Sequence, residues 1–331
     1  MSERQLTFRE AIREALREEM KRDERIFLIG IDMQNVNIIN HVVDGLYQEF
    51  GPERMISTPI VEAGFTGASL GAAMTGMRPV VEVGNGCFLF RAYDEVTNEI
   101  AKYRYICGGG SFKLPLVIRV ANYAGIEAGG GPQHAQNTES RFIGSPGIKV
   151  VSPSTPRDAK GLLKTAIRED APVLFFEHKM LYNTKGEVPE DPEFMLPFGS
   201  AAVRREGKDI TIVTWSLMVQ RSLDAAEQLA KEGIQAEVID LRTLIPYDRR
   251  TLLESVKKTG RAMFVEEGTK TGGVGAELAA FLSEEGFKFL KAPIRRVAAP
   301  DMVLPSSGYG TKLFIPQVAD IAASIRSLMG K

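Results

Sequence analysis

The chain has 331 residues, of which 44% are hydrophobic and 25% are charged. At roughly 100 to 200 residues per domain this length predicts two domains, and the composition is that of a globular protein, which excludes a single small module and a disordered chain. The 41 Lys and Arg residues are balanced by 42 Asp and Glu residues, and no basic stripe is present that would neutralise a run of phosphates. We therefore expect no nucleic acid partner.

The N-terminal segment and the cysteines bear on the cellular compartment in which the protein is expected. Residues 1–23 alternate charged and apolar side chains at helical spacing and contain no apolar run, so we expect neither a signal peptide nor a membrane anchor. The two cysteines, Cys87 and Cys107, are too few for a four-ligand zinc site or a disulfide framework, and we predict that both are core thiols. A cytoplasmic protein is expected.

Short apolar runs alternate with amphipathic helical patterns along the chain. A capping box of Thr7 and Glu10 begins the first helix, and Thr155 followed by Pro156 begins a later helix that runs to Asp170. Runs rich in Val, Ile, Leu or Phe predict strands at 26–31, 79–83, 116–120, 149–152, 173–177, 210–215, 236–240, 262–266 and 295–298. Such continuous runs are typical of strands buried on both faces, so the predicted fold class is α/β, with mainly parallel sheets covered by helices.

These patterns stop between Asn183 and Gly199, where Pro, Gly and acidic residues dominate. Such a stretch is typical of a linker between domains. We therefore predict a first domain over 1–185, a linker over 186–199 and a second domain over 200–331.

A glycine-rich helical pattern runs from Ala63 to Met77, directly after Glu62. Glycine in a helix costs up to about 1 kcal/mol per site relative to alanine, so a compensating interaction is expected. We favour close packing against another backbone; the alternative is a helix N-terminus beside a ligand or a subunit interface. Glu62 itself has apolar neighbours, which suits proton exchange in a poorly solvated site, but an acid stabilised at a helix start has the same pattern. Both alternatives for Glu62 stay open.

Two further glycine-rich segments require explanation. Gly129, Gly130 and Gly131 followed by Pro132 exclude a regular helix, so His134 is predicted in a loop, with either a catalytic or a surface role. The segment GTKTGGVGAELAAFL at 268–282 opens a helix after a strand and matches a dinucleotide fingerprint only loosely. No G-x-x-x-x-G-K-[ST] loop occurs in the sequence, so no phosphate-binding motif is predicted from the residues alone.

Five segments together resemble the beta subunit of thiamine-diphosphate-dependent 2-oxo acid dehydrogenases: TPIVEAGFTGASLGAAMTGMRP, GPQHAQN, PGIKVVSPSTPRDAKGLLKTAIREDAPV, VIDLRTLIPYD and EEGTKTGGVGAELAA. They span nearly the whole chain, which excludes a chance match. Within the family, FFEHKMLYNTKGEVPE looks closest to the acetoin dehydrogenase branch, although pyruvate and branched-chain members have similar stretches. The resemblance implies two transketolase-like domains, of which the first binds the pyrimidine ring of thiamine diphosphate.

The resemblance also implies an obligate partner. Enzymes of this group hold the diphosphate through Mg²⁺ with a G-D-G motif, which this chain lacks, so an alpha subunit is expected to supply the Mg²⁺ half of the site in an α2β2 heterotetramer. The expected reaction is decarboxylation of a 2-oxo acid, or cleavage of an acyloin, followed by reductive acylation of lipoamide. The lipoyl group would belong to a separate acyltransferase component.

Several residues match functional positions of the family. Glu62 matches the glutamate that hydrogen-bonds the aminopyrimidine ring nitrogen and moves a proton there, and His134 matches the loop histidine near the substrate. Phe88 matches the aromatic residue that stacks on the pyrimidine, although a core aromatic is the alternative. The family also has a structural potassium site made by backbone carbonyls, here those of Ala166, Glu169 and Ala171.

Two stretches depart from the family pattern. Ile31 stands where an acid is common, and PDMVLPSSGYG replaces the usual segment near the C-terminus. Both changes concern the substrate and the subunit contacts rather than the cofactor. Two alternatives to the dehydrogenase subunit stay open: a split transketolase-like subunit that transfers ketol units between sugars, and a catalytically silent assembly subunit.

Overall fold

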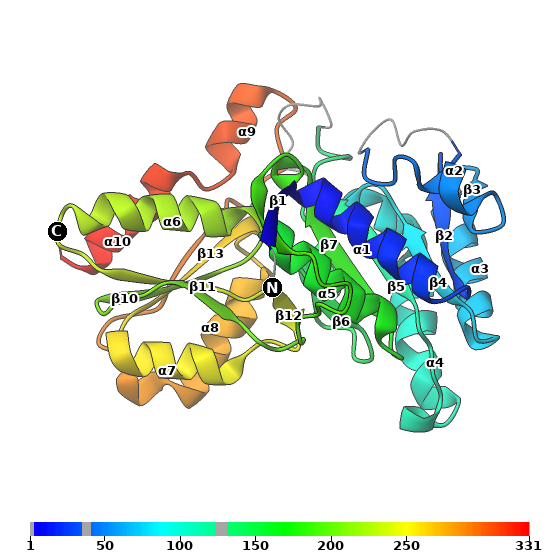
Figure 1. Cartoon of the computed structure of the whole chain (residues 1–331). Helices are drawn as coiled ribbons and strands as arrows, with labels where there is room; N and C mark the ends of the chain where they lie inside the picture. The colour runs from blue at the N-terminus through cyan, green and yellow to red at the C-terminus, as the bar shows by residue number, and fades with distance from the viewer. Residues whose placement is uncertain (1–2, 35–40, 123–130, 331) are drawn as a thin grey trace. The chain divides into compact units, whose positions relative to one another are not determined.

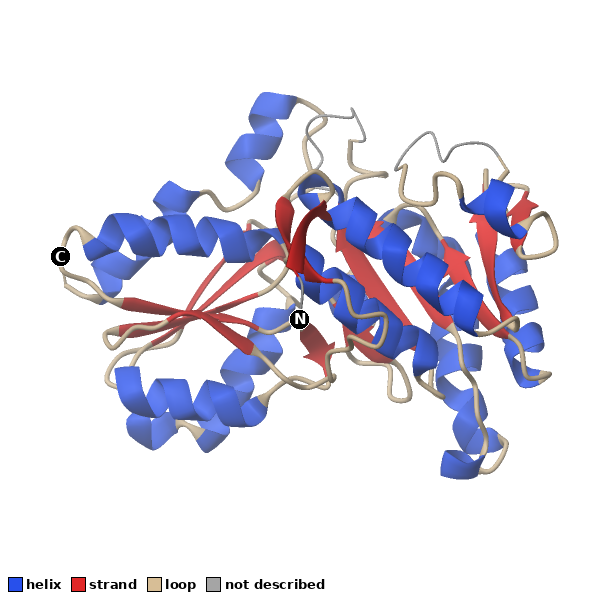
Figure 2. Cartoon of the chain, viewed as in Figure 1, coloured by secondary structure: helices blue, strands red, loops and turns tan. Residues whose placement is uncertain are grey.

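The structure is a computed structural model that describes residues 3–34, 41–122 and 131–330 (Figure 1). The chain divides into two compact units, one made of residues 1–123 and 141–198 and the other of residues 124–140 and 199–331. In each unit helices cover a mainly parallel sheet, so the predicted α/β fold class is confirmed (Figure 2). No helix within the described ranges is both long enough and apolar enough to cross a membrane.

The main sheet of the first unit contains parallel strands in the order β6-β7-β5-β4-β2-β3. The strands are β2 (Ile26–Ile31), β3 (Met55–Thr58), β4 (Arg78–Glu82), β5 (Val117–Asn122), β6 (Lys149–Val151) and β7 (Val173–His178). Every residue of β4, β5 and β7 is buried, which explains why these strands are continuous apolar runs. The predicted strands of this half are confirmed to within two residues at each end, whereas β3 was not predicted.

Helices α1 and α5 begin at the residues that the capping signals predict. Thr7 accepts a hydrogen bond from the Glu10 N–H, and the Glu10 side chain accepts one from the Thr7 N–H at 2.8 Å. Pro156 is the first residue of α5, and Thr155 caps this helix. The helices of the first unit are α1 (Phe8–Arg22), α2 (Leu46–Phe50), α3 (Glu62–Met74), α4 (Ala101–Ile106) and α5 (Pro156–Arg168), with short turns η1 (Gly86–Ala92), η2 (Glu95–Ile100), η3 (Gly109–Ser111) and η5 (Lys179–Leu181).

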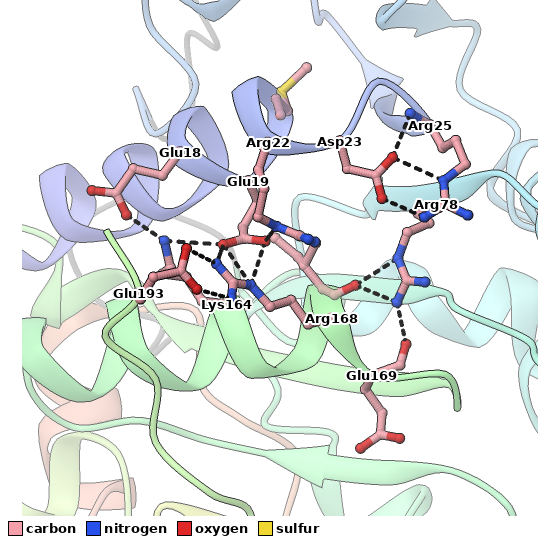
Figure 3. A network of polar contacts seen from close by, with 12 residues as sticks. Glu18, Glu19, Arg22, Asp23, Arg25, Arg78, Lys164, Arg168, Glu169 and Glu193 are labelled. Atoms are coloured by element: carbon pink, nitrogen blue, oxygen red, sulfur yellow. Dashed lines mark hydrogen bonds and ion pairs between the residues drawn. The ribbon is translucent and has the colours of Figure 1, made fainter. Parts of the chain in front are cut away.

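A buried ionic network joins α1 to α5 (Figure 3). Glu19 is fully buried, and its carboxylate accepts hydrogen bonds from Arg168 at 2.8 Å and from Arg22 at 2.8 Å. The Lys164 ammonium, also fully buried, lies 3.1 Å from the same carboxylate. Burial opposes the charged form of Glu19, but these donors hold its pKa below the ordinary value. The two helices are therefore fixed to each other by paired charges as well as by apolar contacts.

The segment predicted as a linker packs on the first unit. It contains strand β8 (Lys185–Pro189), which pairs antiparallel with β1 (Glu3–Thr7). Further along, the Leu196 N–H donates to the Gly161 carbonyl at 3.2 Å, and a Cβ on Gly161 would lie 2.8 Å from the Leu196 side chain. Gly161 thus makes room on α5 for this segment. The domain boundaries stay a prediction.

The sheet of the second unit has the order β14-β13-β10-β11-β9, in which only β9 is antiparallel to its neighbour. Its strands are β9 (Ala202–Arg205), β10 (Ile210–Thr214), β11 (Ala236–Asp240), β13 (Ala262–Thr269) and β14 (Arg295–Ala299); β12 (Thr243–Ile245) is a short additional strand. Helices α6 and α10 bury an apolar core against one face, and α7 and α8 cover the other (Figure 1). The helices and the short η4 and η6 are α6 (Leu217–Ala230), α7 (Arg249–Thr259), α8 (Val274–Glu285), α9 (Gly308–Phe314), α10 (Val318–Leu328), η4 (Glu139–Arg141) and η6 (Phe287–Phe289).

Candidate active site

The strand order of the first sheet reverses between β2 and β4. After β2 the chain adds β3 on one side, and it then returns to add β4 on the other side of β2. In open α/β sheets, ligands bind beyond the carboxyl ends of the strands at such a switch point. Helix α3, which connects β3 to β4, packs against both β2 and β4, so its N-terminus is the first place to look for a site.

Glu62 is the first residue of α3, and 6% of its surface is exposed. Its side chain lines a hollow of about 380 Å³ together with Ile60, Val61, Ala63 and Arg91. Glu62 thus begins a helix and has apolar neighbours, and both alternatives for its role stay predictions. The amide groups of the first helical turn favour a negative charge at this position.

The Glu62 carboxyl forms no hydrogen bond or ion pair with any residue that the structure describes. The carboxyl oxygens are not among the fully buried polar atoms that lack a partner, so they are open to the hollow that Glu62 lines. A polar group that enters the hollow from outside this chain would satisfy the carboxyl. Glu62 therefore has the position and the free hydrogen-bonding capacity of a ligand-binding acid.

The short helix η1 carries two more residues of the site region and packs against α3. Phe88 is half-buried, whereas its neighbours Cys87 and Leu89 are buried, so part of the Phe88 ring is accessible. Arg91 is exposed and lines the same hollow as Glu62. Sequence reasoning missed Arg91, because no local sequence pattern connects it with Glu62. The two residues come together only because η1 packs on α3.

A charged cluster lies on three neighbouring strands of the first sheet, β4, β5 and β7, and the segment that leads to η1 follows β4. Arg119 on β5 donates to Glu82 on β4 at 2.6 Å and to Glu177 on β7 at 2.6 and 3.0 Å, and all three side chains are almost fully buried. The Tyr182 hydroxyl donates to Glu177 at 2.8 Å. Burial raises the pKa of Glu82, and the positive charge of Arg119 opposes this shift. Burial lowers the pKa of Lys179 to about 8, and the negative charge of Glu82 opposes that shift. The cluster was also missed by sequence reasoning.

The Glu82 carboxyl has a second contact, with the turn that begins the segment leading to η1. It accepts a hydrogen bond from the Gly84 N–H at 3.2 Å, and Gly84 has a positive φ of 75°. This conformation favours glycine. The charged cluster therefore fixes the start of the segment that carries Phe88 and Arg91.

The glycine-rich face of α3 is largely exposed. A Cβ on Gly71 would meet no atom within 4 Å, and one on Gly67 would meet only the Glu95 side chain, at 3.9 Å. Close packing of these glycines against another backbone of this chain, which the sequence favoured, is therefore wrong for the part of the chain described. An exposed small-residue face fits the alternative, a helix at a subunit interface.

His134 lies in a turn of the second unit and is exposed. Its backbone N–H donates to the Gly131 carbonyl at 3.3 Å, which closes the predicted glycine loop. Residues 129 and 130 of that loop lie outside the described residues. The structure thus brings Glu62 and Arg91 to one hollow of the first unit, with Phe88 on the helix η1 beside it, and places His134 in the other unit.

The carbonyls predicted to bind potassium lie in the last turn of α5, for Ala166, or just after it, for Glu169 and Ala171. Arg78 donates to the carbonyl of Glu169 at 2.8 Å and to the carbonyl of Ile167 at 2.9 Å (Figure 3). The Ala166 carbonyl accepts from the Glu169 N–H at 3.3 Å. The end of α5 is therefore a site that already attracts one cation, as the negative end of a helix does.

The cysteines are both free, and they differ in environment. Cys87 is buried in η1, as predicted, but Cys107 is exposed, so the prediction of two core thiols is wrong for Cys107. Cys107 caps the C-terminal end of α4, where the chain leaves the helix at the surface. No group of three or more His, Cys, Asp or Glu side chains within the described ranges is arranged to hold a metal ion.

Comparisons with known proteins identify the family of the chain. The transketolase pyrimidine-binding domain matches residues 4–185, and the transketolase C-terminal domain matches residues 199–321. The chain is 42% identical over 325 residues to the 2-oxoisovalerate dehydrogenase subunit beta of Bacillus subtilis (strain 168), with 98% of each chain covered. The chain belongs to the family of 2-oxo acid dehydrogenase beta subunits. The resemblance found in the sequence is thus confirmed.

The chain is also similar to a pyruvate dehydrogenase subunit and to a solved transketolase structure. The chain is 43% identical over 324 residues to the pyruvate dehydrogenase E1 component subunit beta of Rickettsia felis, with 98% of each chain covered. The structure matches one described as "Split gene transketolase, inactive beta4 tetramer" with a TM-score of 0.80 and 25% identity, covering 98% of this chain and 99% of that one. The family and its pyrimidine-binding domain imply thiamine diphosphate as the cofactor and a heteromeric assembly.

Proposed function

We propose that this beta subunit contributes Glu62, Phe88 and His134 to the active site of a 2-oxo acid or acetoin dehydrogenase whose acyl acceptor is a lipoyl disulfide. The observation that carries the proposal is the buried carboxyl of Glu62, which lines a hollow at the switch point of the first sheet and has no hydrogen-bonding partner among the described residues. A carboxyl in this position suits a ligand that presents a ring nitrogen to it.

Glu62 would hold and move a proton at the aminopyrimidine ring nitrogen of thiamine diphosphate. When bound, the cofactor supplies the nucleophilic carbon and the electron sink that cleavage beside a carbonyl requires. Phe88 would stack on the pyrimidine with the accessible part of its ring, and the apolar side chains of Ile60 and Val61 would keep water from the Glu62 carboxyl. His134 would bind or protonate the substrate and meet the incoming lipoyl group.

The diphosphate half of the site requires a partner. The chain has no G-D-G motif, and its described residues gather no metal-binding group. We therefore place Mg²⁺ on an alpha subunit in an α2β2 assembly, with a lipoyl-bearing acyltransferase as the third component. The exposed glycine face of α3 is consistent with such an interface.

Potassium is proposed at the end of α5, on the carbonyls of Ala166, Glu169 and Ala171. Ala166 lies in the last turn of α5, and Glu169 and Ala171 follow it, so these carbonyls are near the negative end of the helix dipole. A carbonyl oxygen has two lone pairs, so the Glu169 carbonyl can accept from Arg78 and also face a cation. The residues present therefore fit a monovalent ion.

A split transketolase is the second candidate, because the structure matches the split gene transketolase tetramer over nearly its whole length. The identity of 25% to that protein is well below the 42% and 43% to the two dehydrogenase subunits. The dehydrogenase subunit is therefore the better-supported function.

An activity assay on the assembled pair tests the proposed function. Co-expressed with a chain that carries a G-D-G motif, this chain is expected to form a heteromer that releases CO₂ from 2-oxo acids, or cleaves acetoin, only when thiamine diphosphate and Mg²⁺ are added. The substrate panel should include pyruvate, branched-chain 2-oxo acids, acetoin and sugar phosphates. Turnover of sugar phosphates without a lipoyl domain would support the transketolase, and a pair that ignores added thiamine diphosphate would refute both.

Ile60 is expected to be part of the contact with the alpha subunit. It borders the Glu62 hollow, and 78% of its surface is exposed. Burying such a side chain against a partner would stabilise the complex by about 1.5–3 kcal/mol. Ile60→Ser should weaken association of the two chains roughly ten- to hundredfold in a binding titration. Ile60→Val is the control, since it keeps most of the apolar area, and the melting temperature of the isolated chain should stay the same in both variants. Equal affinities for Ile60→Ser and the wild type would contradict an interface here.

A further inference from the structure

The sheet of the second unit has its own switch point, between β10 and β13. After β10 the chain adds β11 on one side, and β13 is added later on the other side of β10. Trp215 directly follows β10, and Glu266 lies in the second half of β13. Glu266 is buried, with 2% of its surface exposed, and none of the reaction steps proposed above uses it.

The glycine-rich start of α8 holds the carboxyl of Glu266. The carboxylate oxygen accepts a hydrogen bond from the Gly275 N–H at 3.1 Å. A Cβ on Gly273 would lie 2.6 Å from both carboxyl oxygens of Glu266, and one on Gly275 would lie 2.7 Å from one of them. The segment that loosely matched a dinucleotide fingerprint therefore makes room for a carboxyl of the protein itself, at a helix N-terminus of the kind that otherwise binds phosphate.

A second buried carboxyl belongs to the segment that carries His134. Glu139 has 4% of its surface exposed and accepts a hydrogen bond from the Trp215 indole Nε1 at 3.2 Å. Trp215 has 2% of its surface exposed. Residues 131–140 belong to the second unit, whose other residues begin only at 199. The contact between Glu139 and Trp215 is therefore one of the contacts that hold this segment on the second unit.

The two carboxyls interact electrostatically. Burial raises the pKa of Glu266 to about 8, and the negative charge of Glu139 adds to the shift. The amide groups of Gly275 and Val274 and the guanidinium of Arg296 on β14 oppose it. At neutral pH Glu266 therefore keeps its proton, and the buried pair carries one negative charge fewer than two ionised carboxylates would.

We propose that Glu139 and a protonated Glu266 are positioning residues that, together with Trp215, hold the segment that carries His134 on the second unit. When this proton is lost, two buried like charges repel each other, Glu139 moves away from the Trp215 indole, and the segment is released. The effect on catalysis rests on the proposed role of His134, whereas the linkage between the carboxyls does not.

Trp215 is the single tryptophan of the chain, so its fluorescence reports this linkage directly. In the isolated full chain, the emission maximum of the wild type is expected to shift to longer wavelength between pH 7 and pH 9, with a midpoint near pH 8. Glu266→Gln should abolish this transition, because a neutral amide cannot lose the proton. Glu139→Gln should move the midpoint to lower pH, because it removes the neighbouring negative charge. Glu277→Gln, which changes an exposed acid on α8, should leave the transition unchanged.

Either of two outcomes would overturn the proposal: no transition in the wild type, or the same transition in Glu266→Gln. Circular dichroism identifies a variant that does not fold, and in that case Glu139→Gln, whose change lies outside the sheet, carries the test alone. In the assembled enzyme, transfer to lipoamide should fall more than tenfold from pH 7 to pH 9 in the wild type and less in Glu266→Gln. A fluorescence transition without this change in activity would contradict the role of His134 and leave the linkage intact.

Discussion

Replacement of Glu62 by glutamine is expected to lower kcat of the assembled enzyme by a factor of about 10² to 10⁴, the range that general acid–base groups contribute. Glutamine has nearly the same size and keeps a hydrogen-bonding oxygen, but it cannot accept and return a proton. The measurement is the rate of CO₂ release from the preferred 2-oxo acid at saturating thiamine diphosphate. Gel filtration should show that the subunits still assemble.

Glu53→Gln is the matched control, because Glu53 is an exposed acid of the same unit, outside the hollow. Its kcat should equal that of the wild type. Wild-type turnover in Glu62→Gln as well would support the catalytically silent assembly subunit and refute the role given to Glu62.

Replacement of Arg119 by methionine is expected to destabilise the protein by about 3–5 kcal/mol at neutral pH, the usual cost of removing one partner from a buried ionic group. Arg119 has 1% of its surface exposed and pairs with Glu82 and Glu177, so its removal leaves two buried carboxyls without a counter-charge. Urea unfolding of the full chain measures the loss. The loss should be smaller at pH 5 than at pH 8, since burial already raises the pKa of Glu82 and protonation of a carboxyl removes the unpaired charge.

The triple variant Arg119→Met, Glu82→Gln, Glu177→Gln separates charge from packing. Because it removes the two carboxyls that Arg119→Met leaves without a counter-charge, its free energy of unfolding should be higher than that of Arg119→Met alone at pH 8. If Arg119→Met costs no more than about 1 kcal/mol, which is typical of an average substitution, the cluster does not hold the sheet together.

The strands and helix starts that were predicted correctly have strong local signals. Strand β2 is the apolar run Ile26–Ile31, and α1 begins after a capping box at Thr7. Strand β3, Met55–Thr58, was missed because it is short and only its first residue is buried. Strand β8 was missed because its sequence contains Gly and Pro, and it forms only by pairing with β1.

The sequence by itself determined the α/β class, the thiamine-dependent family and the position of Glu62 before a glycine-rich helix, because each depends on residues that are close together in the chain. Only the tertiary structure decided that Arg91 shares a hollow with Glu62, that Arg119 joins two carboxyls 37 and 58 positions away, and that the glycines of α8 hold Glu266. The physical reason is that burying a charge is costly unless an opposite charge is buried beside it. Neighbouring strands of a parallel sheet are separated in sequence by a whole crossover helix, so no local pattern reveals such a pair.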